Sequence, residues 1–199
     1  MKKKIIALSA AIAICAIALV GGSLAWFTSS AEVTNTFTVG NVSITLDETT
    51  GTEYLIVPGA LLDKDPTVTV KAGSADCWVY VYIDNQIKLG EETYATPNVI
   101  GSEVEGAGYW VAVNAEAKPN LYRYSKKVEK SDADTPLTPV FTTVTIAPGN
   151  VLTNAKMNAL DESDPNIAVT AFAIQADNIE SEDADEEAWA ALGPKSPES

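Results

Sequence analysis

The sequence predicts an all-β protein whose strands form one antiparallel sandwich of the jelly-roll or immunoglobulin type. Apolar and polar residues alternate with a period of two through most of the chain, as in half-buried strands. Turn-forming pairs such as Pro58-Gly59 and Pro148-Gly149 separate these segments. No long segment has a helical period, and many short strands without crossover helices pack as an antiparallel sandwich.

Residues 1–25 have the layout of a secretory signal peptide. Three lysines at positions 2–4 precede an apolar segment at 5–20, and Gly-Gly-Ser-Leu-Ala follows. We expect cleavage between Ala25 and Trp26. The alternative is a permanent membrane anchor, but this segment of 16 residues is shorter than the roughly 20 residues that span a bilayer.

The mature chain is predicted to be one acidic domain without disulfides. Without the lysines at 2–4, ten of the 13 basic residues remain against 27 acidic ones, a formal charge of −17. This charge disfavours nucleic acid and anionic membranes as partners, and it makes self-association sensitive to salt. Cys77 is the single cysteine after the signal peptide, so a packed core must stabilise the domain.

The first strand is predicted at residues 26–39, where Val33, Phe37 and Val39 alternate with polar residues. Gly40-Asn41 then changes the register through a bulge or tight turn. The sandwich domain itself is expected at 40–179. Its first strand is marked by the alternating residues Val42, Ile44 and Leu46.

Further strands are predicted at 54–57, 67–70, 77–83, 109–113, 121–128, 140–146 and 167–175. The segment 77–83 has aliphatic residues on one face and Trp78, Tyr80 and Tyr82 on the other, so it is expected to be a central strand covered on both faces. Residues 90–108 and 130–139 are predicted as exposed loops, because small, polar and charged residues prevail there.

An acidic tail is predicted at 180–199. Six of the eight residues at 180–187 are acidic, and Ser181 could cap a short helix that runs to residue 192 before Gly193-Pro194. Carboxylates are also the ligands that calcium prefers, but no loop has EF-hand spacing. A solvated acidic surface is therefore the better interpretation of Asp161, Glu162, Asp164, Asp177 and residues 180–187.

Catalytic chemistry has little support in this sequence. The chain has no histidine, which removes the commonest general base and the usual zinc ligand. Cys77 has no histidine to activate it and is expected to be structural. We predict no cofactor, no metal and no enzymatic activity. The acids that could suggest a glycosidase are expected simply to be exposed: Glu91, Glu92, Glu103 and Glu105.

Several segments resemble the TasA/camelysin family. The signal peptide runs directly into Trp26-Phe27-Thr28 and then into Ala-Glu-Val-Thr-Asn-Thr-Phe-Thr-Val-Gly-Asn-Val at 31–42. Further similar segments are Val57-Pro58-Gly59, Lys-Asp-Pro-Thr-Val-Thr-Val at 64–70, Gly-Ser-Ala-Asp at 73–76, and Ala-Ile-Gln-Ala at 173–176 before the acidic stretch.

The resemblance implies a jelly-roll-like protein exported by a Gram-positive bacterium to its surface or extracellular matrix. A SipW-type signal peptidase would cleave it, and copies of the chain would polymerise into biofilm fibres, with or without a minor helper protein. In such fibres the N-terminal segment is a donor strand that completes a neighbour's sheet. The corresponding residues here are Trp26, Phe27, Thr28, Val33 and Phe37. Alternatively, they dock in their own sandwich.

Two other functions remain as alternatives. A monomeric adhesin or binding module could use Trp78, Tyr80, Tyr82 or the 90–108 loop to contact carbohydrate or protein. The family resemblance also includes a metallo-endopeptidase label, but this chain lacks both histidine and a His-Glu-x-x-His helix, so we do not expect it to inherit that activity.

Overall fold

The strands of the domain form two packed layers. The computed structural model describes residues 37–39, 41–50, 55–161 and 166–194. All of these lie in the compact unit formed by residues 34–199. Their secondary structure is mostly antiparallel strand with two short helices, α2 (Asn154–Asp161) and α3 (Ser181–Leu192), which confirms the predicted all-β class.

The first layer is a five-stranded sheet with the order β1-β13-β5-β10-β9. All its pairings are antiparallel except that of β1 with β13. β5 lies at the centre, where the alternation of aliphatic and aromatic residues predicted it. The strands are β1 (Phe37–Val39), β5 (Cys77–Asn85), β9 (Trp110–Asn114), β10 (Lys118–Tyr124) and β13 (Ile167–Gln175).

The second layer consists of two three-stranded sheets, β11-β4-β2 and β3-β12-β8. A backbone hydrogen bond links the two sheets, because Val140 N, just before β12, donates to Pro66 O, just before β4, at 2.8 Å. The strands are β2 (Ile44–Asp47), β3 (Leu61–Asp63), β4 (Thr67–Val70), β8 (Ala95–Val99), β11 (Thr135–Pro136) and β12 (Phe141–Ile146), and a small hairpin is formed by β6 (Lys88–Leu89) and β7 (Glu92–Thr93).

The main core lies between these layers. On β5, the side chains at positions 77, 79, 81 and 83 point into it and are at most 4% exposed. The second layer contributes alternate residues of β2, β4 and β12, including Ile44, Val68 and Val144. The side chains that the period-two pattern of β5 puts on one face are thus buried in the core.

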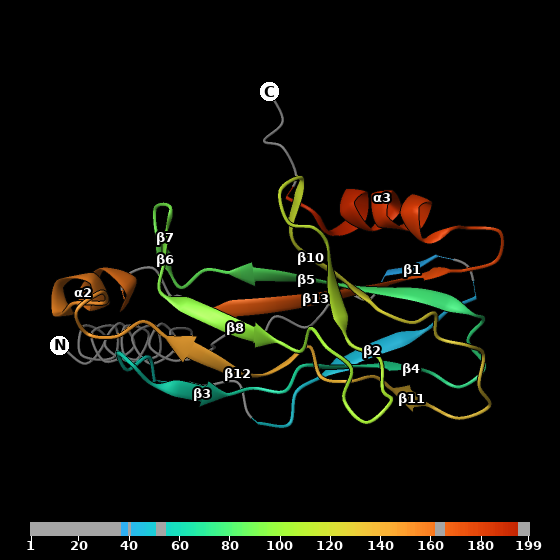
Figure 1. Cartoon of the computed structure of the whole chain (residues 1–199), viewed down its shortest axis with the longest axis horizontal. Helices are drawn as coiled ribbons and strands as arrows, with labels where there is room; N and C mark the ends of the chain where they lie inside the picture. Colours follow the sequence, from blue (N-terminus) through green and yellow to red (C-terminus); the bar gives the residue numbers. More distant parts are fainter. Residues whose placement is uncertain (1–36, 40, 51–54, 162–165, 195–199) are drawn as a thin grey trace, which may run out of the picture. The chain divides into compact units, whose positions relative to one another are not determined.

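α3 covers the other face of the five-stranded sheet (Figure 1). Ala184 and Ala188 are fully buried against a second apolar cluster that contains Tyr80, Leu121 and Phe172. Their small side chains allow the helix to lie close to the sheet. The helix was predicted, but its N-cap residue is Glu180, without a side-chain capping bond, so the predicted Ser181 cap is wrong.

Other predictions need correction. Residues 55–57 are not a strand, and residue 54 lies outside the described part. The predicted loop at 90–108 contains β7 and β8, and β8 pairs with β12. Pro97 is accommodated because β8 is an edge strand, where a missing N–H costs no ladder bond. β3 and α2 were not predicted.

Candidate strand-docking site

Of the residues predicted for signal-peptide cleavage and for the donor strand, the structure describes only Phe37. Phe37 is the first residue of β1. The rest lie outside the described residues: Ala25, Trp26, Phe27, Thr28 and Val33. The site can therefore be described from the strand on which β1 docks.

β1 occupies less than half of the edge that β13 offers. Phe37 pairs with Phe172, Thr38 with Ala173 and Val39 with Ile174, all in parallel. On its other side, β13 pairs with β5 along all nine residues from Ile167 to Gln175. Within the described ranges, no strand lies beside residues 167–171 on the β1 side.

The hydrogen-bonding groups of this edge follow from the ladder with β5. Gln86 N donates to Asn166 O at 2.8 Å, and Ala176 N donates to Asp76 O at 2.7 Å. In an antiparallel ladder, hydrogen-bonded positions alternate, so even-numbered residues of β13 bond to β5. Odd-numbered residues, including Ile167, Val169 and Ala171, direct their N–H and C=O groups toward the edge.

The β13 edge is apolar on both faces. Ala171 and Ala173 are buried in the main core, and Ile167 and Val169 pack against it while partly buried. Phe172 and Ile174 face the opposite way, into the cluster under α3. An extended segment with apolar residues could therefore add to β13 and bury side chains in the core, which is the usual chemistry of strand addition.

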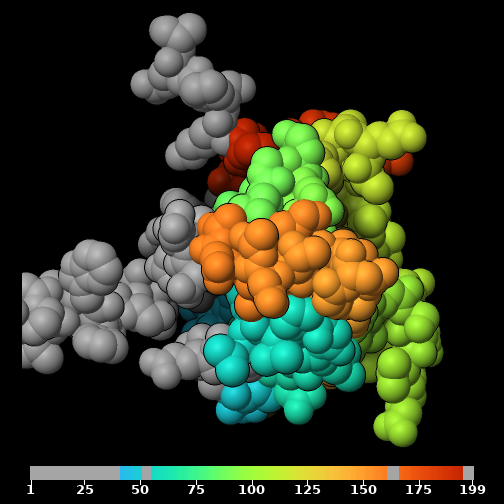
Figure 2. Space-filling model, turned by 90° about the vertical axis from the view of Figure 1, so that its left-hand side faces the viewer, coloured from blue at the N-terminus to red at the C-terminus, as the bar shows by residue number. Residues whose placement is uncertain are grey.

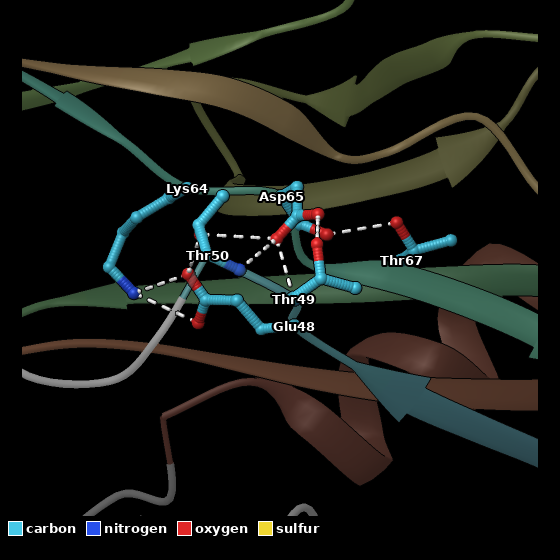
Figure 3. Close-up of polar contacts among 6 residues, drawn as sticks. All are labelled: Glu48, Thr49, Thr50, Lys64, Asp65 and Thr67. Atoms are coloured by element: carbon cyan, nitrogen blue, oxygen red, sulfur yellow. Dashed lines mark hydrogen bonds and ion pairs between the residues drawn. The ribbon is translucent and has the colours of Figure 1, made fainter.

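A polar cluster holds the end of β2 against the segment between β3 and β4 (Figure 3). The Asp65 carboxylate accepts hydrogen bonds from the backbone N–H groups of Thr49 and Thr50, at 2.8 and 3.0 Å, and from both hydroxyl groups. Beside it, Lys64 Nζ lies 2.9 Å from a Glu48 carboxylate oxygen. Desolvation opposes ionisation of Asp65, but the hydrogen bonds from Thr49 and Thr50 prevail and lower its pKa.

This cluster does not suit a metal ion. Four donor groups already surround the Asp65 carboxylate, whereas a cation needs unoccupied oxygen lone pairs. In the part of the chain that the structure describes, no three His, Cys, Asp or Glu side chains are grouped closely enough to hold a metal. With no histidine in the whole chain, the residues do not fit a peptidase zinc site.

The described acids among those considered for calcium do not form a group of three that could hold a metal. Asp185 and Glu186 are both in α3, and they form ion pairs with Arg123 and Lys118, respectively. The side chains of the acids at 161–164 lie outside the described part. In the 90–108 segment, Glu92 accepts a 2.5 Å bond from the Tyr94 hydroxyl and lies 2.8 Å from Lys156 Nζ.

Of the β5 residues with candidate roles, Cys77 and Tyr80 are buried, and Trp78 and Tyr82 are half-buried. The Cys77 side chain is fully buried, and desolvation, with a contribution from Asp76, raises its pKa to about 12, so the thiol is not a nucleophile at neutral pH. Tyr80 is also fully buried and donates to Asp185 at 2.8 Å, while Trp78 Nε1 donates to Ile179 O at 3.3 Å. α3 and the segment just before it thus pack against Trp78 and Tyr80, two of the three aromatic residues considered for an adhesin. The ring centre of Trp189 in α3 lies 6.4 Å from that of the third, Tyr82.

Comparison with known proteins gives one match. Residues 1–84 match a family model described as camelysin metallo-endopeptidase. No curated protein and no solved structure matches the chain significantly. In the described residues, neither helix has the length and apolar character needed to cross a membrane.

Proposed function

We propose that this chain, whose resemblance to the TasA/camelysin family is confirmed over residues 1–84, is a secreted structural subunit of extracellular fibres in a biofilm matrix. Signal peptidase removes residues 1–25. Residues 26–38 of one copy then add to the sheet of a second copy by donor-strand complementation. The partner is the chain itself, and the protein is not an enzyme.

The observation that carries this proposal is the β13 edge. Three residues of β1 already pair there in parallel, and residues 167–171 continue the same edge with outward N–H and C=O groups. Unpaired strand edges are templates for another chain. Strand addition combines main-chain hydrogen bonds with burial of alternate side chains.

The side chains available as metal ligands argue against a zinc peptidase. Zinc peptidases hold the metal with histidine and carboxylate ligands, and this chain contains no histidine. Asp65, a carboxylate of the matched segment, is surrounded by donors rather than open to a ligand. The family description therefore supports the family relationship and not a catalytic activity.

Electron microscopy of the purified mature protein, residues 26–199, tests this function. We expect filaments from this protein and none from residues 39–199. Adding isolated residues 26–38 as a peptide to the truncated protein should fill the acceptor edge and produce stable monomers. Equal filament formation by both proteins would exclude the donor-strand mechanism, and a stable monomer from residues 26–199 would exclude the fibre function.

A proline substitution tests the acceptor edge. Val169→Pro removes one outward N–H from β13 without removing a bond to β5, so filament elongation should fall at least tenfold. Ala112→Pro is the matched control, since the pairing of Ser125 N with Tyr109 O places the Ala112 N–H on the outer side of β9, the opposite edge of the same sheet. Both variants need a melting curve to show that the monomer is folded.

A further inference from the structure

Exposed apolar side chains gather at one end of the domain. Leu55 is 80% exposed, Leu61 61%, Val57 46% and Val151 38%. In the described residues, these are four of the six large hydrophobic side chains that are exposed to this degree. We call these four residues the apolar end patch. A concentration of this kind is typical of a surface that binds another molecule.

Two proline-glycine turns build the patch. Gly59 N donates to Ala147 O at 3.0 Å, Ile146 N donates to Ala60 O at 2.9 Å, and a Cβ on Gly149 would lie 3.8 Å from Pro58 Cβ. The segment that begins at Leu55 thus lies directly beside the turn that carries Val151. Figure 2 shows these two segments, teal and orange, next to each other at this end of the protein.

Neighbouring side chains that pack against the main core hold the apolar end patch in place. Ile56 and Leu62 alternate with the patch residues and pack against the main core, so their neighbours Val57 and Leu61 are directed outward. Ala60 N donates to Val57 O at 2.9 Å and closes the turn between them. A preorganised apolar surface loses little conformational entropy when it binds a partner.

We infer that the apolar end patch binds Trp26 and Phe27 of a second copy of this chain, and so anchors the free end of its donor strand. This inference rests on the proposed function. The occupant is argued from chemistry and from length. Trp26 and Phe27 are large and apolar, and residues 28–31 between them and the strand carry no charge. An uncharged contact also avoids repulsion between two copies that each carry many acidic residues.

The length of the segment matches the path. If the donor strand takes the place of the acceptor's own β1, in the register in which Phe37 pairs with Phe172, its residues 32–36 lie along residues 167–171. The six residues 26–31 then extend about 20 Å beyond Ile167. In this arrangement residues 32–36 pair with β13, residues 28–31 span the gap, and Trp26 and Phe27 contact the apolar end patch.

The patch lies within that reach of the beginning of β13. Ile167 pairs with Asn85, whose side-chain Nδ2 donates to Ala95 O at 2.8 Å. Ala95 pairs with Ile146, which in turn donates to Ala60 O. The three backbone pairings span about 5 Å each and the Asn85 side-chain bridge less than about 10 Å, so Ala60, the residue beside Leu61, lies at most about 25 Å from Ile167. The direct distance is shorter, because the path turns at each step.

Polymerisation of patch variants tests the inference. Leu61→Thr and Val57→Thr should each raise the critical concentration for filament formation about tenfold, because each removes an apolar contact at the interface. Val104→Thr and Val111→Thr are matched controls, since both valines are exposed elsewhere. Trp26→Thr should have the same effect as Leu61→Thr, and the double variant should be no worse than either single variant.

Crosslinking identifies the occupant directly. A Thr28→Cys protein mixed with a Leu61→Cys protein should form a disulfide between two copies, while Thr28→Cys mixed with Val104→Cys should not. A Thr28→Cys/Leu61→Cys chain that closes an internal disulfide as a monomer would overturn the inference. Wild-type filaments with unchanged elongation of Leu61→Thr would overturn it too and leave the fibre function intact, whereas absence of wild-type filaments would remove the fibre function itself.

Discussion

Gly108 is a residue whose missing side chain makes room for an aromatic pair. A Cβ at this position would lie within 2.7 Å of the Cε1, Cζ and Oη atoms of Tyr124. Tyr124 in turn contacts Trp110 edge-on, with ring centroids 5.2 Å apart. Trp110 is 1% exposed, and its Nε1 donates to Thr138 O at 2.9 Å, which links the two layers.

Gly108→Ala should therefore destabilise the domain by about 1–3 kcal/mol, the usual cost of overpacking a core. Urea unfolding followed by tryptophan fluorescence measures it. Gly101→Ala is the matched control, because its nearest atoms would be 3.8 and 3.9 Å away, at ordinary contact distance. Equal unfolding midpoints for the two variants would contradict this account of Gly108.

Asp65 predicts a pH effect on stability. Its folded-state pKa is lower than the ordinary 3.8, so its stabilising contribution is complete above that value and is lost as the pH falls through the folded-state pKa. Asp65→Asn should cost about 1–2 kcal/mol at pH 7, since hydrogen bonds to a charged acceptor are lost. The loss should be smaller at pH 3.

Chemical denaturation of both proteins at pH 7 and pH 3 measures this difference. Asp63→Asn, a neighbouring and exposed acid in β3, is the control and should change neither value. A constant difference between the wild type and Asp65→Asn at both pH values would show that the charge of Asp65 does not stabilise the fold.

At the level of elements, Arg123, the single arginine of the chain, connects β10 to α3 through an ion pair with Asp185. Arg123 Nη1 lies 2.8 and 3.0 Å from the two Asp185 oxygens, and its guanidinium lies 5.6 Å from the centre of the Trp78 ring. Tyr80 donates to the same carboxylate, and burial raises the pKa of Tyr80, so its hydroxyl remains a donor at neutral pH. The contact joins three residues that are buried or half-buried.

Asp185→Asn should loosen α3 and lower stability by about 1–3 kcal/mol, because the Arg123 charge is left poorly compensated in a half-buried place. Glu187→Gln, on the exposed side of the same helix, is the control. Limited proteolysis near residue 192, read by mass spectrometry, should cleave the Asp185→Asn protein faster. Equal cleavage rates for the two variants would mean that the ion pair does not hold the helix.

The elements also show which signals the sequence carries. β4 and β13 were predicted with their observed bounds, because long period-two alternation marks strands well. α2 has eight residues and only Met157 and Leu160 packed on or in the core, too few for a helical period. β8 was hidden by Pro97 and small side chains, which usually indicate a loop.

The candidate site was less predictable than the fold. The sequence indicated Phe37 as part of a docking strand, but the choice of β13 as its neighbour joins residues 135 positions apart and depends on the whole sheet. The cover of α3 over Trp78 and Tyr80 depends on contacts between residues about 100 positions apart. The apolar end patch was missed because two separate turns form it.

For the whole molecule, charge should control assembly. The formal charge is −14, or −17 without residues 1–25, so copies repel one another at low ionic strength. Raising the salt concentration from 0.01 to 0.15 M shortens the screening length from about 30 to about 8 Å. Filament elongation, followed by light scattering, should speed up several-fold over this range. Elongation that slowed with salt would indicate that attractive ion pairs drive assembly.

The buried thiol of Cys77 can report opening of the domain in a protein without residues 1–25, where it is the single cysteine. Because β5 is the central strand and the thiol is fully buried with its pKa raised to about 12, a thiol-reactive reagent can modify it only when the sheet separates. The labelling rate therefore measures how often a subunit opens. If the proposed filaments form, a subunit within one should be labelled far more slowly than a free subunit, and the labelling rate would then measure how fast subunits leave the filament.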